Sequence, residues 1–164
     1  MSETDELLQN AEAYAERFDR GHLHGTPAKK IMVVACMDAR VIPTRILGLE
    51  EGDAHVIRNA GGVVSDDAIR SIAISQHLLG TEEIVLIQHT DCGMQKFTDD
   101  ELAERLEDHA GEPPPFEIGS FQDLEQNLRD SLEALRGSPF LLKTDAVRGY
   151  VYEVETGRLR ELSG

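Results

Sequence analysis

The chain has 164 residues, and its 31 acidic against 16 basic side chains give a formal charge of −15 at pH 7. This length predicts one domain spanning residues 1–164, with a single hydrophobic core. The acidic balance disfavours a nucleic-acid partner, because phosphate backbones are bound by lysine and arginine. No run of about twenty apolar residues occurs, so we expect no membrane span and no membrane partner.

The N-terminus is acidic where a secretory signal would be basic and then apolar, which predicts a cytoplasmic protein. A disulfide between Cys36 and Cys92 is not expected in that reducing compartment, so both cysteines are available for metal binding or catalysis. The acidic surface has two interpretations. It is either an ordinary solvated surface or an adaptation to high salt, which screens repulsion between carboxylates.

The predicted elements alternate between helices and strands. Apolar residues within 6–20 have the spacing of an amphipathic helix that stops at Gly21, and this N-terminal segment, 1–21, is expected to pack on a partner subunit. Three apolar segments have the length of buried strands: 31–36, 55–57 and 83–88.

Ser65 is placed to cap a helix that extends to residues 77–79 and ends at Gly80. Asp66 and Asp67 suit its first turn, where the helix dipole favours negative charge. This helix lies between two predicted strands, which gives a strand–helix–strand unit.

The last third of the chain is expected to add two helices and a hairpin. The first helix covers 99–109, and after a proline-rich loop at 111–115 Ser120 is expected to cap a second one that ends near Gly137. A strand at 147–154 and a turn at 155–157 complete the chain, the strand lying antiparallel at an edge. The predicted fold is therefore α/β, a mainly parallel β-sheet flanked by helices with an antiparallel C-terminal edge strand or hairpin.

Two polar motifs follow predicted strands directly. Cys36-x-Asp38-x-Arg40 follows the first strand and His89-x-x-Cys92 follows the third, at the strand ends where ligands collect in parallel sheets. Two thiolates and an imidazole suit zinc, and three protein ligands leave a fourth position for water or substrate.

The first motif also places a carboxylate and a guanidinium beside the thiolate. If the strand continues in extended form, alternate spacing directs Cys36, Asp38 and Arg40 to one side. Arg40 can then bind the Asp38 carboxylate through two hydrogen bonds and keep it ionised.

These motifs resemble those of the β-class carbonic anhydrases, particularly the compact microbial branch of that family. The resemblance is carried by ACMDAR at 35–40, RNAGG at 58–62 and HTDCGM at 89–94, covers about residues 31–94, and is weaker in the C-terminal hairpin. It implies one zinc ion per chain bound by Cys36, His89 and Cys92. It further implies reversible hydration of carbon dioxide to bicarbonate by a zinc-bound hydroxide, which the Asp38–Arg40 pair orients.

The resemblance leaves the resting state of the site open. In some members of the family the aspartate equivalent to Asp38 becomes a fourth zinc ligand and closes the site, generally at lower pH. The resemblance also implies a homodimer or higher homo-oligomer, with the N-terminal helix lying across the neighbouring subunit.

Two other functions remain open. The first is a carbon disulfide or carbonyl sulfide hydrolase on the same scaffold. The second is a non-catalytic zinc- or bicarbonate-binding module, although the presence of both Asp38 and Arg40 argues against it, since a structural zinc site normally has four protein ligands.

Other polar positions carry weaker predictions. Residues 58–62 either line the pocket or form a plain turn, and they are not a dinucleotide-binding fingerprint. The remaining histidines are interpreted as ordinary surface or helix residues rather than site residues: His22, His24, His55, His77 and His109.

Overall fold

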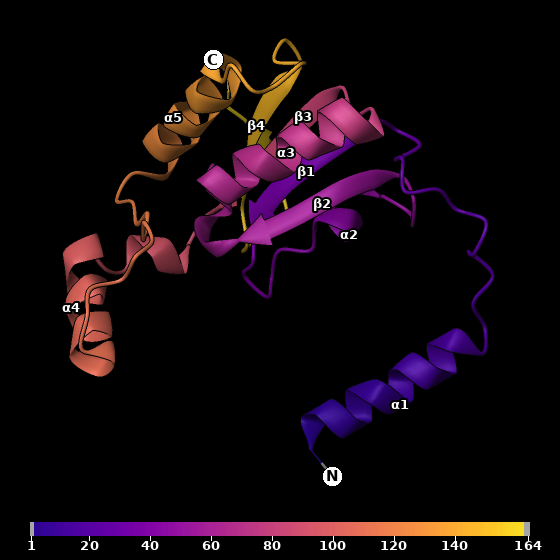
Figure 1. Cartoon of the computed structure of the whole chain (residues 1–164), viewed down its shortest axis with the longest axis horizontal. Helices are drawn as coiled ribbons and strands as arrows, with labels where there is room; N and C mark the ends of the chain where they lie inside the picture. The colour runs from indigo at the N-terminus through magenta and orange to yellow at the C-terminus, as the bar shows by residue number, and fades with distance from the viewer. Residues whose placement is uncertain (1, 163–164) are drawn as a thin grey trace.

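The computed structural model describes residues 2–162, so both ends of the predicted 1–164 domain lie outside the described residues. Its centre is a five-stranded sheet of order β2-β1-β3-β4-β5 (Figure 1). The strands have these bounds: β1 Ile31–Cys36, β2 Ala54–Asn59, β3 Glu83–His89, β4 Val147–Tyr152 and β5 Leu159–Glu161. The pairs β1/β2, β1/β3 and β3/β4 are parallel, and only β5 is antiparallel to its neighbour. The predicted fold class is thus confirmed, although the strand at 147–152 is itself parallel to β3 and the antiparallel edge is β5.

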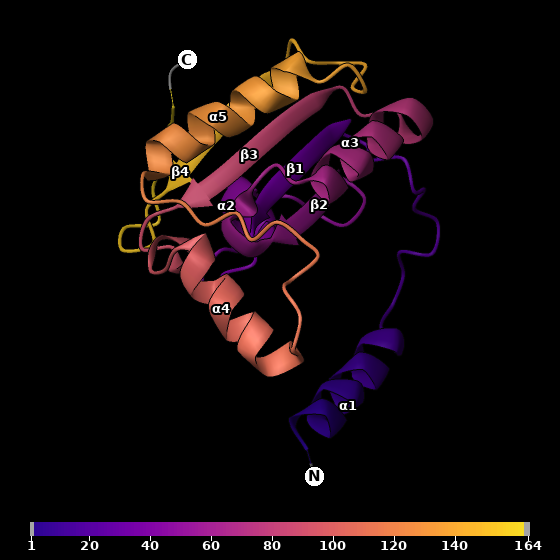
Figure 2. The ribbon, with the colours of Figure 1, turned by 60° about the vertical axis from the view of Figure 1, so that its left-hand side comes forward.

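Helices cover the sheet unequally. The helices are α1 Glu3–Ala15, α2 Pro43–Leu47, α3 Asp66–Leu79, α4 Asp99–Ala110 and α5 Leu124–Gly137, with two short 3-10 turns, η1 Ala60–Gly62 and η2 Gly93–Gln95. Helices α3 and α5 lie on one face of the sheet and α2 on the other (Figure 2). None of the helices in residues 2–162 is long and apolar enough to cross a bilayer.

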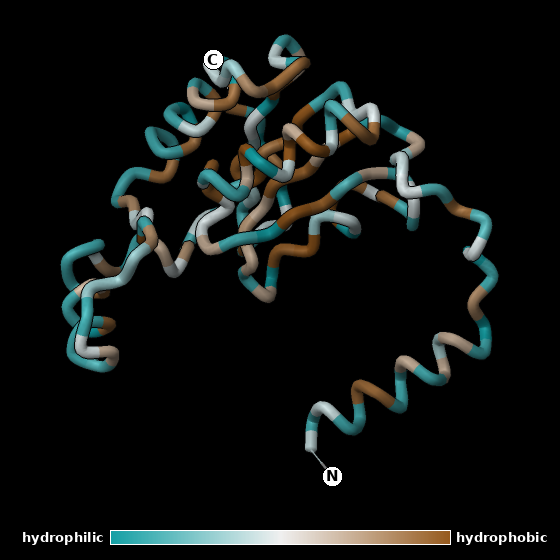
Figure 3. The backbone as a smooth tube through the Cα atoms, viewed as in Figure 1, coloured by the Kyte–Doolittle hydropathy of each residue, from teal (hydrophilic) through white to brown (hydrophobic). Residues whose placement is uncertain are grey.

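Alternation along β1 explains how both faces are packed. Met32 and Val34 pack on one face with Ile72 of α3 and three leucines of α5, while Val33 and Ala35 pack on the opposite face near α2. All four β1 residues are buried, as expected of a central parallel strand covered on both sides. In Figure 3, which colours the backbone by the hydropathy of each residue, hydrophobic residues are concentrated in the sheet.

The capping predictions were right at one helix and wrong at another. Ser65 accepts a hydrogen bond from the Ala68 amide at the start of α3, and Gly80 ends that helix with a left-handed φ of 71°. Helix α5 does not begin at Ser120, because Asp123 caps it by accepting from the Gln126 amide. The Ser120 amide instead donates to Asp99 Oδ1 at 2.7 Å, so this residue anchors the preceding loop to α4.

Helix α1 stands apart from the sheet (Figures 1 and 2), and it begins and ends earlier than predicted. Ser2 and Asp5 form a reciprocal capping box, which places the first helical residue at Glu3 rather than Glu6. No α1 residue is buried, and Leu7 and Leu8 are 66% and 59% exposed. Its far end touches the rest of the chain through a 2.7 Å hydrogen bond that Tyr14 donates to Glu51.

Candidate metal centre

Cys36, His89 and Cys92 lie together at the carboxyl ends of two adjacent strands. Cys36 is the last residue of β1 and His89 the last of β3, and the parallel pairing of these strands brings both to one edge of the sheet. The ligand atoms of the three side chains lie within 4.8 Å of one another, and all three residues are buried. The structure therefore brings together the three side chains that the two motifs single out.

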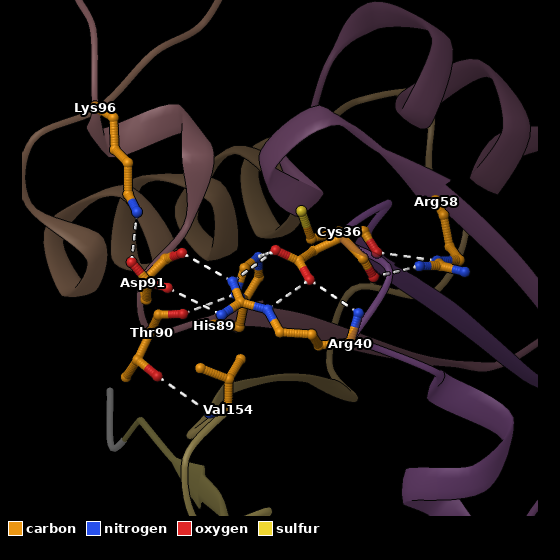
Figure 4. A network of polar contacts seen from close by, with 9 residues as sticks. Cys36, Arg40, Arg58, His89, Thr90, Asp91, Lys96 and Val154 are labelled. Carbon is orange, nitrogen blue, oxygen red and sulfur yellow. Dashed lines mark hydrogen bonds and ion pairs between the residues drawn. The ribbon is translucent and has the colours of Figure 1, made fainter.

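His89 is oriented to offer one ring nitrogen to an ion. Its Nδ1 donates to the Thr90 carbonyl oxygen at 2.9 Å, which leaves the lone pair on Nε2 (Figure 4). Nε2 is fully buried and has no hydrogen-bond partner among residues 2–162. A buried acceptor without a partner is costly, and a metal ion would satisfy it.

Thr90 is itself fixed by the C-terminal hairpin. Its amide donates to the Tyr152 carbonyl oxygen at 3.0 Å, and its hydroxyl accepts from the Val154 amide at 3.1 Å. The orientation of His89 thus depends on backbone contacts with β4 and the turn after it.

The two cysteines affect each other's ionisation. A hydrogen bond between their sulfurs lowers the pKa of Cys36, against the opposing effect of burial, and raises the pKa of Cys92. A cation bound by both sulfurs would allow both to be thiolates. Two soft sulfurs and one free imidazole nitrogen fit a metal ion that prefers tetrahedral sulfur and nitrogen ligands.

Asp38 and Arg40 meet through a turn rather than through a continued strand. Strand β1 ends at Cys36, so the expectation of an extended segment through Arg40 is wrong. Arg40 donates from its amide and Nε to Asp38 Oδ1 at 2.9 and 3.0 Å, and from Nη2 to Oδ2 at 2.8 Å. The short aspartate side chain bonds to the backbone two residues on, which closes the turn and still brings both groups to the cluster.

The Asp38 carboxylate is ionised and lies close to the three donors. The hydrogen bonds from Arg40 hold the pKa of Asp38 well below its usual range, and burial only partly opposes this shift. Asp38 Oδ2 is 3.8 Å from His89 Nε2, yet in this conformation the carboxylate faces Arg40.

A cavity of about 310 Å³ opens beside the cluster, and most of its wall is apolar. The lining residues are Cys36, Met37, Asp38, Ala60, Gly61, Cys92, Gly93, Met94 and Phe97. Of the two interpretations of residues 58–62, the structure supports the pocket wall, because Ala60 and Gly61 line this cavity.

Arg58 and Gly62 shape the same edge of the sheet without lining the cavity. Arg58 donates to the carbonyl oxygens of Cys36 and Asp38 at 2.9 and 2.7 Å, which fixes the backbone of the first motif (Figure 4). Gly62 has a φ of 62°, and a Cβ there would lie 2.8 Å from the Cys36 nitrogen and the Ile87 oxygen. Only glycine fits this close approach between strands.

The sequence analysis missed two charged residues of the site, Asp91 and Lys96. Asp91 Oδ2 accepts from Arg40 Nη1 at 2.9 Å, and its Oδ1 accepts from Lys96 Nζ at 2.6 Å. The only signal for Asp91 was its place inside His89-x-x-Cys92, and spacing alone could not show that it contacts Arg40, 51 residues away.

His55 and His77 have structural hydrogen bonds elsewhere. The ring of His55 bonds to Ser75 Oγ and to the Gly25 carbonyl oxygen, and His77 bonds to the Phe140 carbonyl oxygen. Neither lines the cavity beside the three donors.

Comparison with known proteins connects this geometry to one family. The family described as carbonic anhydrase matches residues 31–112, half of the chain. Beta-carbonic anhydrase 1 of Mycobacterium tuberculosis is 49% identical over 163 residues, which covers 99% of each chain. Carbon disulfide hydrolase of an Acidianus species is 38% identical and covers 96% of this chain and 87% of that protein.

The solved structures agree with the sequence relatives. The crystal structure of carbonic anhydrase from Streptococcus mutans superposes with a TM-score of 0.91 at 40% identity and covers 99% of each chain. The similarity spans the sheet, the helices and both cysteine motifs, so this chain belongs to the β-carbonic anhydrase family.

Proposed function

We propose that this protein is a carbonic anhydrase that catalyses the reversible hydration of carbon dioxide to bicarbonate and a proton. The observation that carries the proposal is the buried Cys36–His89–Cys92 cluster beside an Asp38 carboxylate that Arg40 holds in place. The relatives named carbonic anhydrase support the same assignment.

We propose zinc as the metal, one ion per chain, held by Cys36, His89 and Cys92. Two thiol sulfurs and one free imidazole nitrogen are the donors that zinc prefers, and three protein donors are typical of catalytic rather than structural zinc sites. When bound, zinc would activate water as a nucleophile by lowering the pKa of that water, an effect that two thiolates reduce because they donate charge to the metal.

Asp38 and Arg40 are proposed to act as a pair on the reacting water. An ionised Asp38 accepts a hydrogen bond and so directs the oxygen lone pair toward the substrate. Arg40 provides two parallel hydrogen bonds to the carboxylate, which restrict its rotation and keep it charged.

The cavity suits a small apolar substrate. Met37, Met94 and Phe97 form an apolar wall, in which carbon dioxide needs no hydrogen-bonding partner before it reacts. A charged product such as bicarbonate is less stable against this wall, which favours its release.

Asp38 also supports the alternative, closed state. Its Oδ2 is 3.8 Å from His89 Nε2, so a change of side-chain torsion could direct the carboxylate at the metal position as a fourth ligand. The contacts with Arg40 oppose that change, and we propose that they favour the open state at neutral and alkaline pH.

The test is a stopped-flow assay of carbon dioxide hydration by the zinc-loaded protein at pH values above about 8, where the activated water is deprotonated. Wild-type protein is expected to accelerate hydration. Asp38→Ala is expected to keep its zinc and lose about 10- to 100-fold in turnover, as is typical when a partner of the reacting group is removed. A zinc-loaded wild type that leaves the hydration rate unchanged would instead support the non-catalytic binding module.

A carbon disulfide or carbonyl sulfide hydrolase is the second candidate, favoured by the 38% identity to the Acidianus hydrolase and by the apolar cavity. Parallel assays with carbon dioxide, carbonyl sulfide and carbon disulfide separate the two activities. A higher kcat/KM for either sulfur compound would assign the protein to the second class.

The assembly proposed is a homodimer or higher homo-oligomer in the cytoplasm. Helix α1 leaves Leu7, Leu8 and Tyr14 largely exposed, which supports packing against a second copy. Two free, buried cysteines agree with a reducing compartment.

A further inference from the structure

Asp91 binds two cations with the two oxygens of one carboxylate. Oδ2 accepts from Arg40 Nη1 at 2.9 Å and Oδ1 accepts from Lys96 Nζ at 2.6 Å (Figure 4). The backbone carbonyl oxygen of Asp91 also accepts from Arg40 Nη2 at 3.1 Å. Asp91 therefore makes two contacts with the guanidinium, through Nη1 and Nη2. Asp38 contacts the other edge, through Nε and Nη2.

The two aspartates do not compete for the same hydrogens of Arg40. Asp38 takes the Nε edge and one Nη2 hydrogen, while Asp91 takes Nη1 and leaves the second Nη2 hydrogen to its carbonyl oxygen. The guanidinium has five hydrogens in one plane, so contacts at both edges fix the orientation of that plane.

This second anchor matters because Arg40 is not held by burial. Its side chain is 46% exposed, whereas that of Asp38 is 18% exposed. Among residues 2–162 the guanidinium donates to Asp38 and Asp91, so without Asp91 it would be held there only by the Asp38 carboxylate that it orients.

The backbone at Asp91 is shaped for this contact. Its φ is 53°, in the left-handed region that side-chain-bearing residues seldom occupy and that aspartate, asparagine and glycine tolerate best. This conformation allows the carboxylate and the carbonyl oxygen of the same residue to face Arg40 together.

We propose that Asp91, steadied by Lys96, is a positioning residue that holds the Arg40 guanidinium so that Arg40 presents a fixed pair of donors to Asp38. This inference rests on the proposed catalytic role of Asp38 and Arg40 and extends it by one residue. Asp91 acts through Arg40 and does not touch the reacting water or the substrate.

The test uses two substitutions that the positive φ accepts. Asp91→Gly deletes the carboxylate and is expected to lower kcat for carbon dioxide hydration about 10-fold or more at full zinc content. Asp91→Asn keeps one acceptor oxygen and is expected to lose less. Glu82→Gln is the matched control, because it removes an exposed carboxylate with a 2.7 Å lysine partner at the opposite end of β3, and its kcat should equal that of the wild type.

A readout independent of turnover comes from nitrogen-15 NMR of the zinc-loaded protein. Exchange of the Arg40 Nε hydrogen with solvent is expected to be several-fold faster in Asp91→Gly and unchanged in Glu82→Gln. In an Arg40→Ala background, Asp91→Gly should cause no further loss of kcat.

The outcomes separate the two proposals. Unchanged Arg40 exchange in Asp91→Gly overturns the positioning role, as does a full additional loss of kcat in the Arg40→Ala background. Absence of carbon dioxide hydration in the wild type refutes the proposed function alone, because the NMR exchange still reports whether Asp91 holds Arg40.

Discussion

Helix α1 and the strands β1 and β3 differ in what keeps them in place. Helix α1 has a capping box and a favourable acidic first turn, yet none of its 13 residues is buried. In contrast, β1 is buried at every residue from Met32 to Cys36, and β3 at four consecutive residues that end at His89. A helix this short is marginal in water without packing, so the proposed contacts with a second copy would stabilise α1, whereas the candidate metal centre is held by the sheet of its own chain.

This difference predicts which changes act on the site and which act on the assembly. Substitutions in the sheet should alter metal binding or folding in every copy independently. Substitutions in α1 should alter how copies associate while the sheet remains intact.

The largest expected effect is on metal content. Cys36→Ser replaces a thiolate donor by a hydroxyl that is a poor zinc ligand, so elemental analysis should find almost no bound zinc. Met37→Leu, at the exposed neighbouring residue, should keep one zinc ion per chain. Equal zinc content in the two variants would contradict the role of Cys36 as a ligand.

The next effect is on the stability of the sheet. Gly62→Ala adds a Cβ 2.8 Å from backbone atoms of β1 and β3 at a positive φ, so we expect a loss of about 2–5 kcal/mol in urea unfolding. Gly80→Ala has a similar φ but no atom within 4 Å of the added Cβ, and it should cost about 1–2 kcal/mol. Equal losses would show that crowding between the strands is unimportant.

Substitutions in α1 are expected to change the stability of the fold little but to change the oligomeric state clearly. Replacing Leu7 and Leu8 together by glutamate places charges on an exposed apolar face, which should convert oligomer to monomer in size-exclusion chromatography with light scattering. Glu12→Gln in the same helix should leave the mass unchanged. A wild type that is already monomeric in stabilising salt would remove the proposed role of α1.

The smallest effect concerns the acidic surface. If the charge of −15 reflects adaptation to salt, the melting temperature should rise by a few degrees between dilute buffer and molar potassium chloride, which shortens the Debye length to about 3 Å. A melting temperature independent of salt would support an ordinary solvated surface.

The sequence allowed β1, β3 and α3 to be predicted because their signals are local, whereas β4 was wrongly expected to be antiparallel. Continuous apolar runs marked β1 and β3, and Ser65 and Gly80 marked both ends of α3. Helix α2, of five residues, was missed because it is too short to show a periodic pattern. The order of the strands depends on contacts between distant segments, and no local pattern reports it.

The site was also only partly predictable: its three donor residues were expected, but the contacts around them were not. Cys36, His89 and Cys92 were expected together because parallel strands end at one edge, and the structure brings them together. The contacts of Asp91 with Arg40 and of Arg58 with the Cys36 carbonyl oxygen were not foreseen, since each joins segments more than twenty residues apart.

The anchoring of Thr90 by the C-terminal hairpin has a consequence for how the protein is made. All three donor residues have been synthesised by residue 92, but the frame that orients His89 includes Tyr152 and Val154. A nascent chain that ends before β4 has the sulfurs and the imidazole without the backbone contacts that hold the ring. Metal loading is therefore expected to follow the synthesis of β4 and the turn after it, because these segments complete the contacts that orient His89.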